Sequence, residues 1–157
     1  MRSDNNKAPE TETETETETE TETETETETE TETAKLKQRI LLVDDEESIR
    51  SATEIVLTSK GFTVTCAPDG KMALDLYRAA PDNFDVIVTD QSMPEMTGTE
   101  LSQAIRSLKS NISIILSSGE LGIQDKEKVR GLGITAFIQK PWTTDQLIKV
   151  IQGLDNE

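Results

Sequence analysis

Five short apolar runs, separated by amphipathic segments, restrict the fold of this chain more than any other feature. Each run spans four to six residues, so it predicts a buried strand. Apolar side chains spaced by four and three residues, as at Leu101, Ile105 and Leu108, predict helices between the runs. The runs are Ile40–Val43, Phe62–Ala67, Asp85–Thr89, Ile112–Leu116 and Thr135–Ile138.

The alternation of strands and helices also predicts how the sheet is built. Strands that are apolar on both faces and separated by helices favour a parallel sheet covered on both sides. Gly61 follows the first helical pattern as a stop, and a last pattern spans Leu147–Leu154. Five such units fit one doubly wound α/β domain of five parallel strands, which we place at residues 38–157. In such sheets ligands bind beyond the carboxyl ends of the strands, where the strand order reverses.

An unbroken Glu-Thr repeat from Glu10 to Thr33 sets the N-terminal part of the chain apart. Its period of two imitates a strand, but it holds no apolar residue. Burial therefore cannot offset the ordering entropy or the repulsion between the carboxylates. We predict that residues 1–37 are a disordered, acidic, low-complexity tail that serves as a solvated spacer. The alternative is an acidic arm that binds a partner.

The formal charge of −15 is unevenly distributed along the chain, and this distribution argues against some functions. Residues 1–34 hold two basic and thirteen acidic side chains, a charge of −11, which leaves −4 for residues 35–157. Negative charge without a basic cluster argues against a nucleic-acid partner. No apolar run approaches the roughly 18 residues of a membrane span, so we expect no membrane partner.

The counts of Cys and His exclude further chemistry. A single Cys forbids an internal disulfide and suits a reducing, cytoplasmic location. We expect this residue, Cys66, to be a small buried apolar side chain and not a reactive thiol. The absence of His excludes Ser-His-Asp hydrolysis, His-ligated metals and phosphohistidine chemistry within this chain.

Polar side chains follow four of the five predicted strands at their carboxyl ends. Because the carboxyl ends of parallel strands meet at one edge of a sheet, we expect these side chains to gather there. Adjacent carboxylates repel one another unless a cation lies among them, and ligation by oxygen alone favours Mg²⁺. The side chains are Asp44, Asp45, Asp90, Ser117, Ser118 and Lys140.

This set of groups is suited to phosphoryl transfer. A carboxylate beside Mg²⁺, with an ammonium and a hydroxyl nearby, can attack a phosphoryl group and form an aspartyl phosphate. Each group taken alone has a simpler interpretation. Asp44 and Asp45 could mark a helix N-terminus, Asp90 an ordinary turn and Lys140 a solvated side chain. Their occurrence together, each after a strand, favours a site.

Four segments that close predicted strands are Leu-Leu-Val-Asp44-Asp45-Glu-Glu, Val-Thr-Asp90-Gln-Ser-Met-Pro94-Glu-Met-Thr-Gly98, Ile-Leu-Ser-Ser118-Gly and Phe137-Ile-Gln-Lys140-Pro141. In this order and at this spacing they resemble the receiver domains of response regulators in two-component phosphorelays, and most closely those of hybrid kinases. The resemblance covers Arg39 to Leu154 and implies a flavodoxin-like (βα)5 fold. It leaves open whether the chain is a stand-alone regulator or part of a larger protein.

The resemblance assigns roles at the acidic edge. Asp90 is expected to be the phosphoacceptor and, with Asp45, a direct ligand of Mg²⁺, while Asp44 acts through water. The backbone carbonyl of Ser92 would complete the protein ligands. A cis peptide bond is expected before Pro141.

The resemblance also implies a conformational switch. Lys140 would pair with the phosphoryl group, and the hydroxyl of Ser118, in place of the commoner Thr, would bind a phosphoryl oxygen. We favour Ser118 over Ser117 because the family's hydroxyl precedes a small residue, here Gly119. Phe137 replaces the frequent Tyr, so it would switch through packing; the alternative is a simple core residue.

The function implied is a phosphoacceptor in signalling. A sensor histidine kinase or a phosphotransfer protein would donate a phosphoryl group from phosphohistidine to Asp90. A downstream protein would then bind the face formed by the fourth helix, the fifth strand and the fifth helix. We expect no enzymatic activity beyond Mg²⁺-dependent self-phosphotransfer and autodephosphorylation at Asp90.

Three other functions fit the sequence less well. A phosphatase that forms an aspartyl phosphate would need a second acid where Ser92 stands. A pseudo-receiver that binds partners without phosphorylation would not need Asp90, Lys140 and the acidic pair. A flavin-binding domain would need a Ser/Thr/Gly loop where the chain has four acids, residues 44–47.

Overall fold

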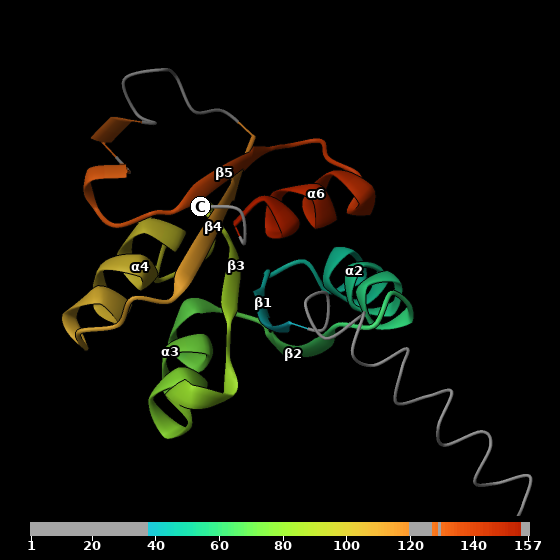
Figure 1. The fold of residues 1–157 in the computed structure, drawn as a ribbon. Coiled ribbons are helices and arrows are strands. Elements are labelled where there is room, and N and C mark those ends of the chain that lie inside the picture. Colours follow the sequence, from blue (N-terminus) through green and yellow to red (C-terminus); the bar gives the residue numbers. More distant parts are fainter. Residues whose placement is uncertain (1–37, 120–126, 129, 155–157) are drawn as a thin grey trace, which may run out of the picture. The chain divides into compact units, whose positions relative to one another are not determined.

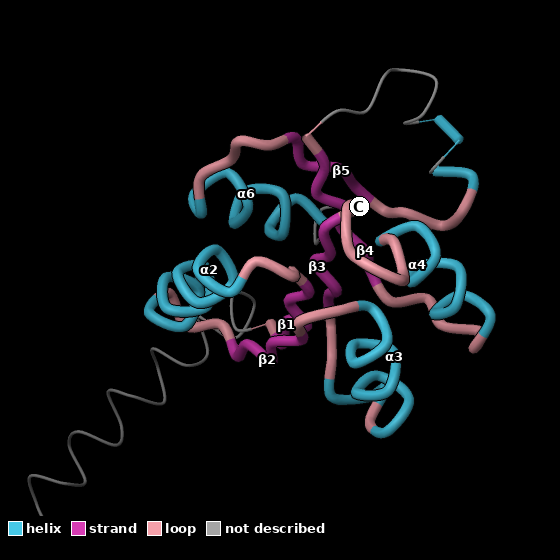
Figure 2. The backbone as a smooth tube through the Cα atoms, turned by 180° about the vertical axis from the view of Figure 1, so that it is seen from behind, coloured by secondary structure: helices cyan, strands magenta, loops and turns pink. Residues whose placement is uncertain are grey.

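The computed structural model describes residues 38–119, 127–128 and 130–154 of the chain. The predicted disordered tail at residues 1–37 lies outside the described residues. Within the described part of the chain, the domain is a sheet with two helices on each face (Figures 1 and 2). None of the helices in these ranges is long and apolar enough to cross a membrane.

The sheet has five parallel strands in the spatial order β2-β1-β3-β4-β5. This order reverses between β1 and β3, as the doubly wound fold requires. The predicted fold class is therefore confirmed. The strands are β1 (Arg39–Val43), β2 (Thr63–Ala67), β3 (Val86–Asp90), β4 (Ser113–Ser118) and β5 (Ala136–Gln139).

Helices α2 and α6 cover one face of the sheet, and α3 and α4 cover the other (Figure 1). Gly61, with φ +101°, lies just beyond the end of α2, as predicted, because glycine tolerates this left-handed conformation. The predicted fourth helix of the domain falls between β4 and β5, largely outside the described residues. The helices are α2 (Glu47–Ser59), α3 (Gly70–Ala79), α4 (Gly98–Ser107) and α6 (Thr144–Leu154), with the 3₁₀ turn η1 (Pro81–Asn83).

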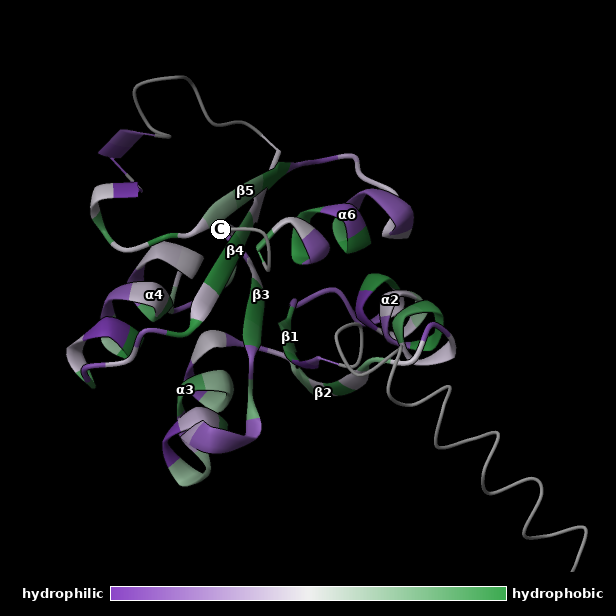
Figure 3. Ribbon diagram, viewed as in Figure 1, coloured by the Kyte–Doolittle hydropathy of each residue, from purple (hydrophilic) through white to green (hydrophobic). Residues whose placement is uncertain are grey.

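Alternate residues of the central strands enter two separate apolar clusters, one on each face of the sheet. In β1, Leu41 packs toward α3 and α4, and Leu42 packs toward α2 and α6. Figure 3 shows the central strands as largely hydrophobic, while the helices carry both kinds of residue. The strands are thus buried on both faces, which explains the continuous apolar runs in the sequence.

Three strands, β3, β4 and β5, extend further at their carboxyl ends than their apolar runs, β5 by the single residue Gln139. The expected run Ile112–Leu116 becomes a strand that continues through Ser117 and Ser118, and β3 includes Asp90. The reason is the backbone ladder, in which Ser117 pairs with Asp90 and Ser118 with Gln139. The candidate functional groups on β3 and β4 therefore belong to the sheet itself and not to flexible loops.

Cys66 is half-buried in β2, not fully buried as predicted, because β2 is an edge strand. Burial, followed by the negative charge of Glu54, raises the pKa of its thiol to about 11. The thiolate is the reactive form, and a rise of about two units from 9.0 lowers its fraction at pH 8 roughly 100-fold. We expect iodoacetamide to alkylate the native protein about 100-fold more slowly than the urea-unfolded protein, as measured by intact mass.

The substitution Glu54→Gln provides the control for this prediction. It removes the second cause of the raised pKa, so alkylation of Cys66 should become faster but remain slower than in the unfolded chain. Equal rates for native and unfolded protein would contradict the prediction.

Candidate functional site

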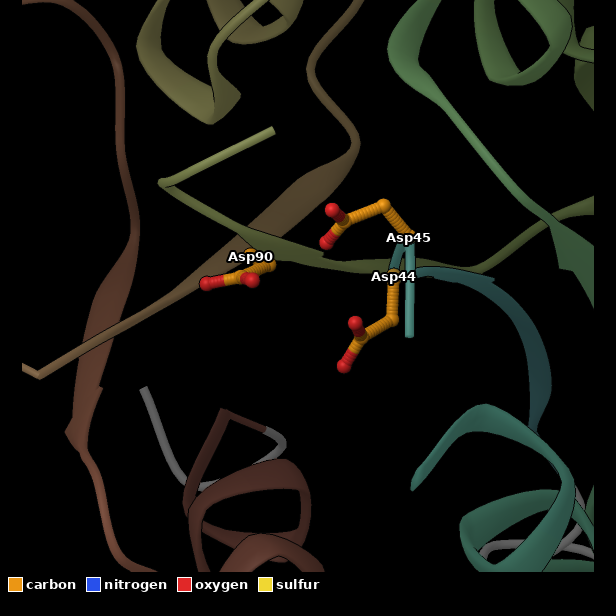
Figure 4. Close-up of side chains that lie close together, drawn as sticks. All are labelled: Asp44, Asp45 and Asp90. Atoms are coloured by element: carbon orange, nitrogen blue, oxygen red, sulfur yellow. The ribbon is translucent and has the colours of Figure 1, made fainter. Parts of the chain in front are cut away.

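Three carboxylates meet at the carboxyl ends of the adjacent strands β1 and β3, where the strand order reverses. Asp44 and Asp45 follow β1 directly, and Asp90 is the last residue of β3. Carboxylate oxygens of the three residues lie within 4.8 Å of one another (Figure 4). Asp44 and Asp90 are buried, each 5% exposed, whereas Asp45 is exposed to solvent. The structure thus brings the predicted acidic centre together at the predicted edge.

Lys140 approaches the same centre from the end of β5. Its Nζ lies 3.1 Å from Oδ2 of Asp90, and its backbone N–H donates to the carbonyl of Ser118 at 2.9 Å. Burial lowers the pKa of Lys140, but the hydrogen bond to Asp90 and the charges of nearby carboxylates outweigh it, so the pKa is raised. The ammonium therefore remains charged and orients the Asp90 carboxylate.

The surroundings of Asp44 show why a cation suits this centre. Burial raises the pKa of Asp44, and the charge of Asp90 acts in the same direction. The backbone N–H of Glu46, which donates to Oδ1 of Asp44 at 2.9 Å, opposes this shift. Arg50 donates from Nη1 to the backbone carbonyl of Asp44 at 2.7 Å and so holds the end of β1. Clustered oxygen donors, one of them open to solvent, fit Mg²⁺, a hard ion that retains water ligands.

The two serines at the end of β4 have different surroundings. Ser117 is almost fully buried, and its hydroxyl accepts a hydrogen bond from Nε1 of Trp142 at 2.7 Å. Ser118 is also buried and pairs with Gln139 beside Lys140. Trp142 thus engages the hydroxyl of Ser117, and the role of Ser118 as the group that contacts a phosphoryl oxygen stays a prediction.

The remaining predicted residues lie around the centre. Phe137 is half-buried on β5, and the guanidinium carbon of Arg130 lies 5.5 Å from its ring centroid. Ser92 is exposed in the loop between β3 and α4. The peptide bond between Lys140 and Pro141 is cis, as the resemblance implied. The roles of Ser92 and Phe137 stay predictions.

Two contacts beside Asp90 are not predicted from the sequence. The side chain of Gln91 bonds to Thr99 at the start of α4, and Trp142 bonds to Ser117. Neither contact leaves a signal in the sequence, since its partners are 8 or 25 residues apart and follow no period.

The fold and the site together define a class of protein. It is an α/β domain with a doubly wound sheet, in which an acidic centre and a lysine lie at the edge where the strand order reverses. The particular family follows from comparison, since residues 40–152 match the response regulator receiver domain. This chain belongs to that family.

Individual relatives agree with this assignment. The cell cycle response regulator CtrA of Brucella ovis is 32% identical over 116 residues, which cover 74% of this chain and 49% of that protein. The chain thus spans about half the length of the curated relatives it matches. The structure of the chemotaxis protein CheY4 of Vibrio cholerae has 33% identity and a TM-score of 0.70, covering 74% of this chain and 98% of that one. The receiver domain of Francisella response regulator 1452 has 29% identity and a TM-score of 0.69, covering 76% and 99%.

Proposed function

We propose that this chain accepts a phosphoryl group on Asp90 from a phosphohistidine of another protein, in the presence of Mg²⁺. The observation that carries the proposal is the placement of Asp90, buried beside Asp44 and Asp45 with Lys140 3.1 Å from its Oδ2. Because residues 1–157 contain no His, the donor imidazole lies outside these residues, and the proposed donors are a sensor histidine kinase or a phosphotransfer protein.

The side chains divide the chemistry between them. A carboxylate oxygen of Asp90 attacks the phosphorus, the P–N bond of the donor breaks, and an acyl phosphate forms. Lys140 holds the carboxylate in place and offsets negative charge on the transferring group. Asp45, Asp90 and the Ser92 carbonyl would hold Mg²⁺ directly and Asp44 through water, and the ion would offset the charge on the phosphoryl oxygens.

The phosphorylated state would act through a change in partner affinity. The Ser118 hydroxyl would bind a phosphoryl oxygen, and Phe137 would repack beside it on the neighbouring strand. This change biases two states of the face that includes β5 and α6, to which a downstream protein binds. We propose no other catalytic activity than self-phosphotransfer and autodephosphorylation at Asp90.

The proposal is tested by incubating the full chain with Mg²⁺ and a small acyl phosphate, followed by intact mass and peptide mapping. We expect one phosphoryl group per chain, located at Asp90, and its absence when EDTA removes the metal. A protein that gains no adduct, or gains it on another residue, contradicts the proposal. Steady hydrolysis of an unrelated phosphomonoester would instead support a phosphatase.

A further inference from the structure

The side chain of Gln91, the residue after Asp90, forms a two-point contact with Thr99 on the first turn of α4. Its Oε1 accepts the backbone N–H of Thr99 at 2.9 Å, and its Nε2 donates to the Thr99 hydroxyl at 3.3 Å. An amide with both ends bonded to one residue is fixed in position and in rotation. Gln91 thus ties the end of β3 to the start of α4.

The backbone of Gln91 is held as well. Its N–H donates to the carbonyl of Ser117 on β4 at 2.8 Å, and its carbonyl accepts from Gly98 at 3.1 Å. All four hydrogen-bonding groups of Gln91 are therefore engaged, and they connect β3, β4 and α4. The loop of residues 91–97 is therefore closed by hydrogen bonds, because Gln91 at its start bonds to Gly98 and Thr99, which follow its end.

Thr99, the partner of Gln91 on α4, is itself held in a network of hydrogen bonds. The Thr99 hydroxyl lies 3.0 Å from that of Thr97, which caps the helix in a reciprocal pair with Glu100. Two hydrogen bonds from Thr97 to the Glu100 carboxylate, one from the backbone and one from the side chain, lower the pKa of Glu100. Within the loop, Glu95 has φ +68°, a conformation that a non-glycine residue keeps only where its surroundings hold it.

Ser92, the expected carbonyl ligand, lies inside this anchored loop between Gln91 and the buried Met93. We propose that Gln91 is a positioning residue for the magnesium centre, because its contact with Thr99 holds the turn from which the Ser92 carbonyl is presented. The inference rests on the proposed function. If Gln91 only stabilised the fold, its loss would lower stability and leave the Mg²⁺ affinity of the folded protein unchanged.

The substitution Gln91→Met tests the inference because it keeps the length of the side chain and removes both hydrogen bonds. We expect the Kd for Mg²⁺, measured by calorimetry on the full chain well below its unfolding transition, to rise about tenfold, which corresponds to about 1.4 kcal/mol. The matched control is Gln103→Met, on the exposed face of α4, which should leave the Kd unchanged.

Substitutions at Thr99 test the same contact from its α4 side and leave the sequence of the loop unchanged. Thr99→Val removes the hydroxyl and should raise the Kd about threefold, since one of the two hydrogen bonds remains. Thr99→Ser keeps the hydroxyl and should therefore keep the wild-type affinity for Mg²⁺. The double variant Gln91→Met, Thr99→Val should lose less Mg²⁺ affinity than the sum of the two single changes, because the Thr99 hydroxyl contacts Gln91 as well as Thr97.

Two outcomes overturn the inference. One is a wild-type Kd in both the Gln91→Met and Thr99→Val variants, and the other is an equal loss in Gln103→Met. If Gln91→Met does not fold, Thr99→Val and Thr99→Ser decide the result. Failure of the proposed function is distinct, since the wild-type chain would then bind no Mg²⁺ or form no adduct at Asp90.

Discussion

The substitution Asp90→Asn is expected to abolish the phosphoryl adduct, which should fall below detection by intact mass under conditions that fully modify the wild-type chain. The amide of Asn is not a nucleophile toward phosphorus, and it removes one of the three carboxylates of the cluster. It also leaves the Lys140 ammonium without its ion-pair partner at 3.1 Å. The Kd for Mg²⁺, measured by calorimetry, should rise in the same variant.

The opposite end of the same strand provides the matched control. Asp85 precedes β3 and forms an exposed ion pair with Arg39 at 3.2 Å, at the amino end of the sheet. Asp85→Asn makes the same chemical change away from the centre, so the adduct should form at the wild-type rate within about twofold. Exposed ion pairs contribute little to stability, so the stability of the Asp85→Asn variant should fall only slightly. An unchanged adduct in Asp90→Asn would show that another side chain is the nucleophile.

The substitution Gly98→Ala is expected to destabilise the domain by about 2–3 kcal/mol and to slow adduct formation roughly 100-fold. A Cβ at position 98 would lie 2.5 Å from the backbone carbonyl oxygen of Asp90 and 2.6 Å from Cδ1 of Leu116. Leu116 is fully buried on β4, and Asp90 is held in the ladder between β3 and β4. The clash can be relieved by moving the start of α4 or the backbone of Asp90, the proposed phosphoacceptor, and either shift alters the edge of the sheet that carries the site.

The measurements for Gly98→Ala are urea unfolding and the rate of adduct formation, corrected for the folded fraction. Gly153→Ala is the control, because a Cβ there meets nothing within 4 Å and the residue lies in α6. Alanine is the better helix former, so this change should raise stability by up to about 1 kcal/mol and leave the rate unchanged. Wild-type stability and rate in Gly98→Ala would contradict the prediction, because they would show that the start of α4 accommodates the added methyl group freely.

Much of the candidate site could be predicted because parallel strands impose its geometry. Once the apolar runs are recognised as parallel strands, the residues that end them share one edge of the sheet, whatever the details of packing. The parallel arrangement therefore predicts that Asp90, Lys140 and the acidic pair lie together, and the structure shows the same arrangement.

The ends of the strands could not be placed in the same way. Hydrophobic periodicity detects burial, whereas Ser117 and Ser118 join β4 through backbone pairing, which is independent of side-chain polarity. The half-burial of Cys66 was missed for a related reason, since only the strand order reveals that β2 is an edge strand.

The sequence by itself determined the class of fold, the edge of the sheet that carries the polar groups and the chemical character of those groups, because these follow from periodicity and from the ends of the strands. Only the tertiary structure decided that Asp44 is buried while Asp45 is exposed, that Trp142 engages Ser117, and that Gln91 joins β3 to α4. The physical reason is that these features depend on the strand order and on contacts between side chains brought together by folding, which follow no period along the chain.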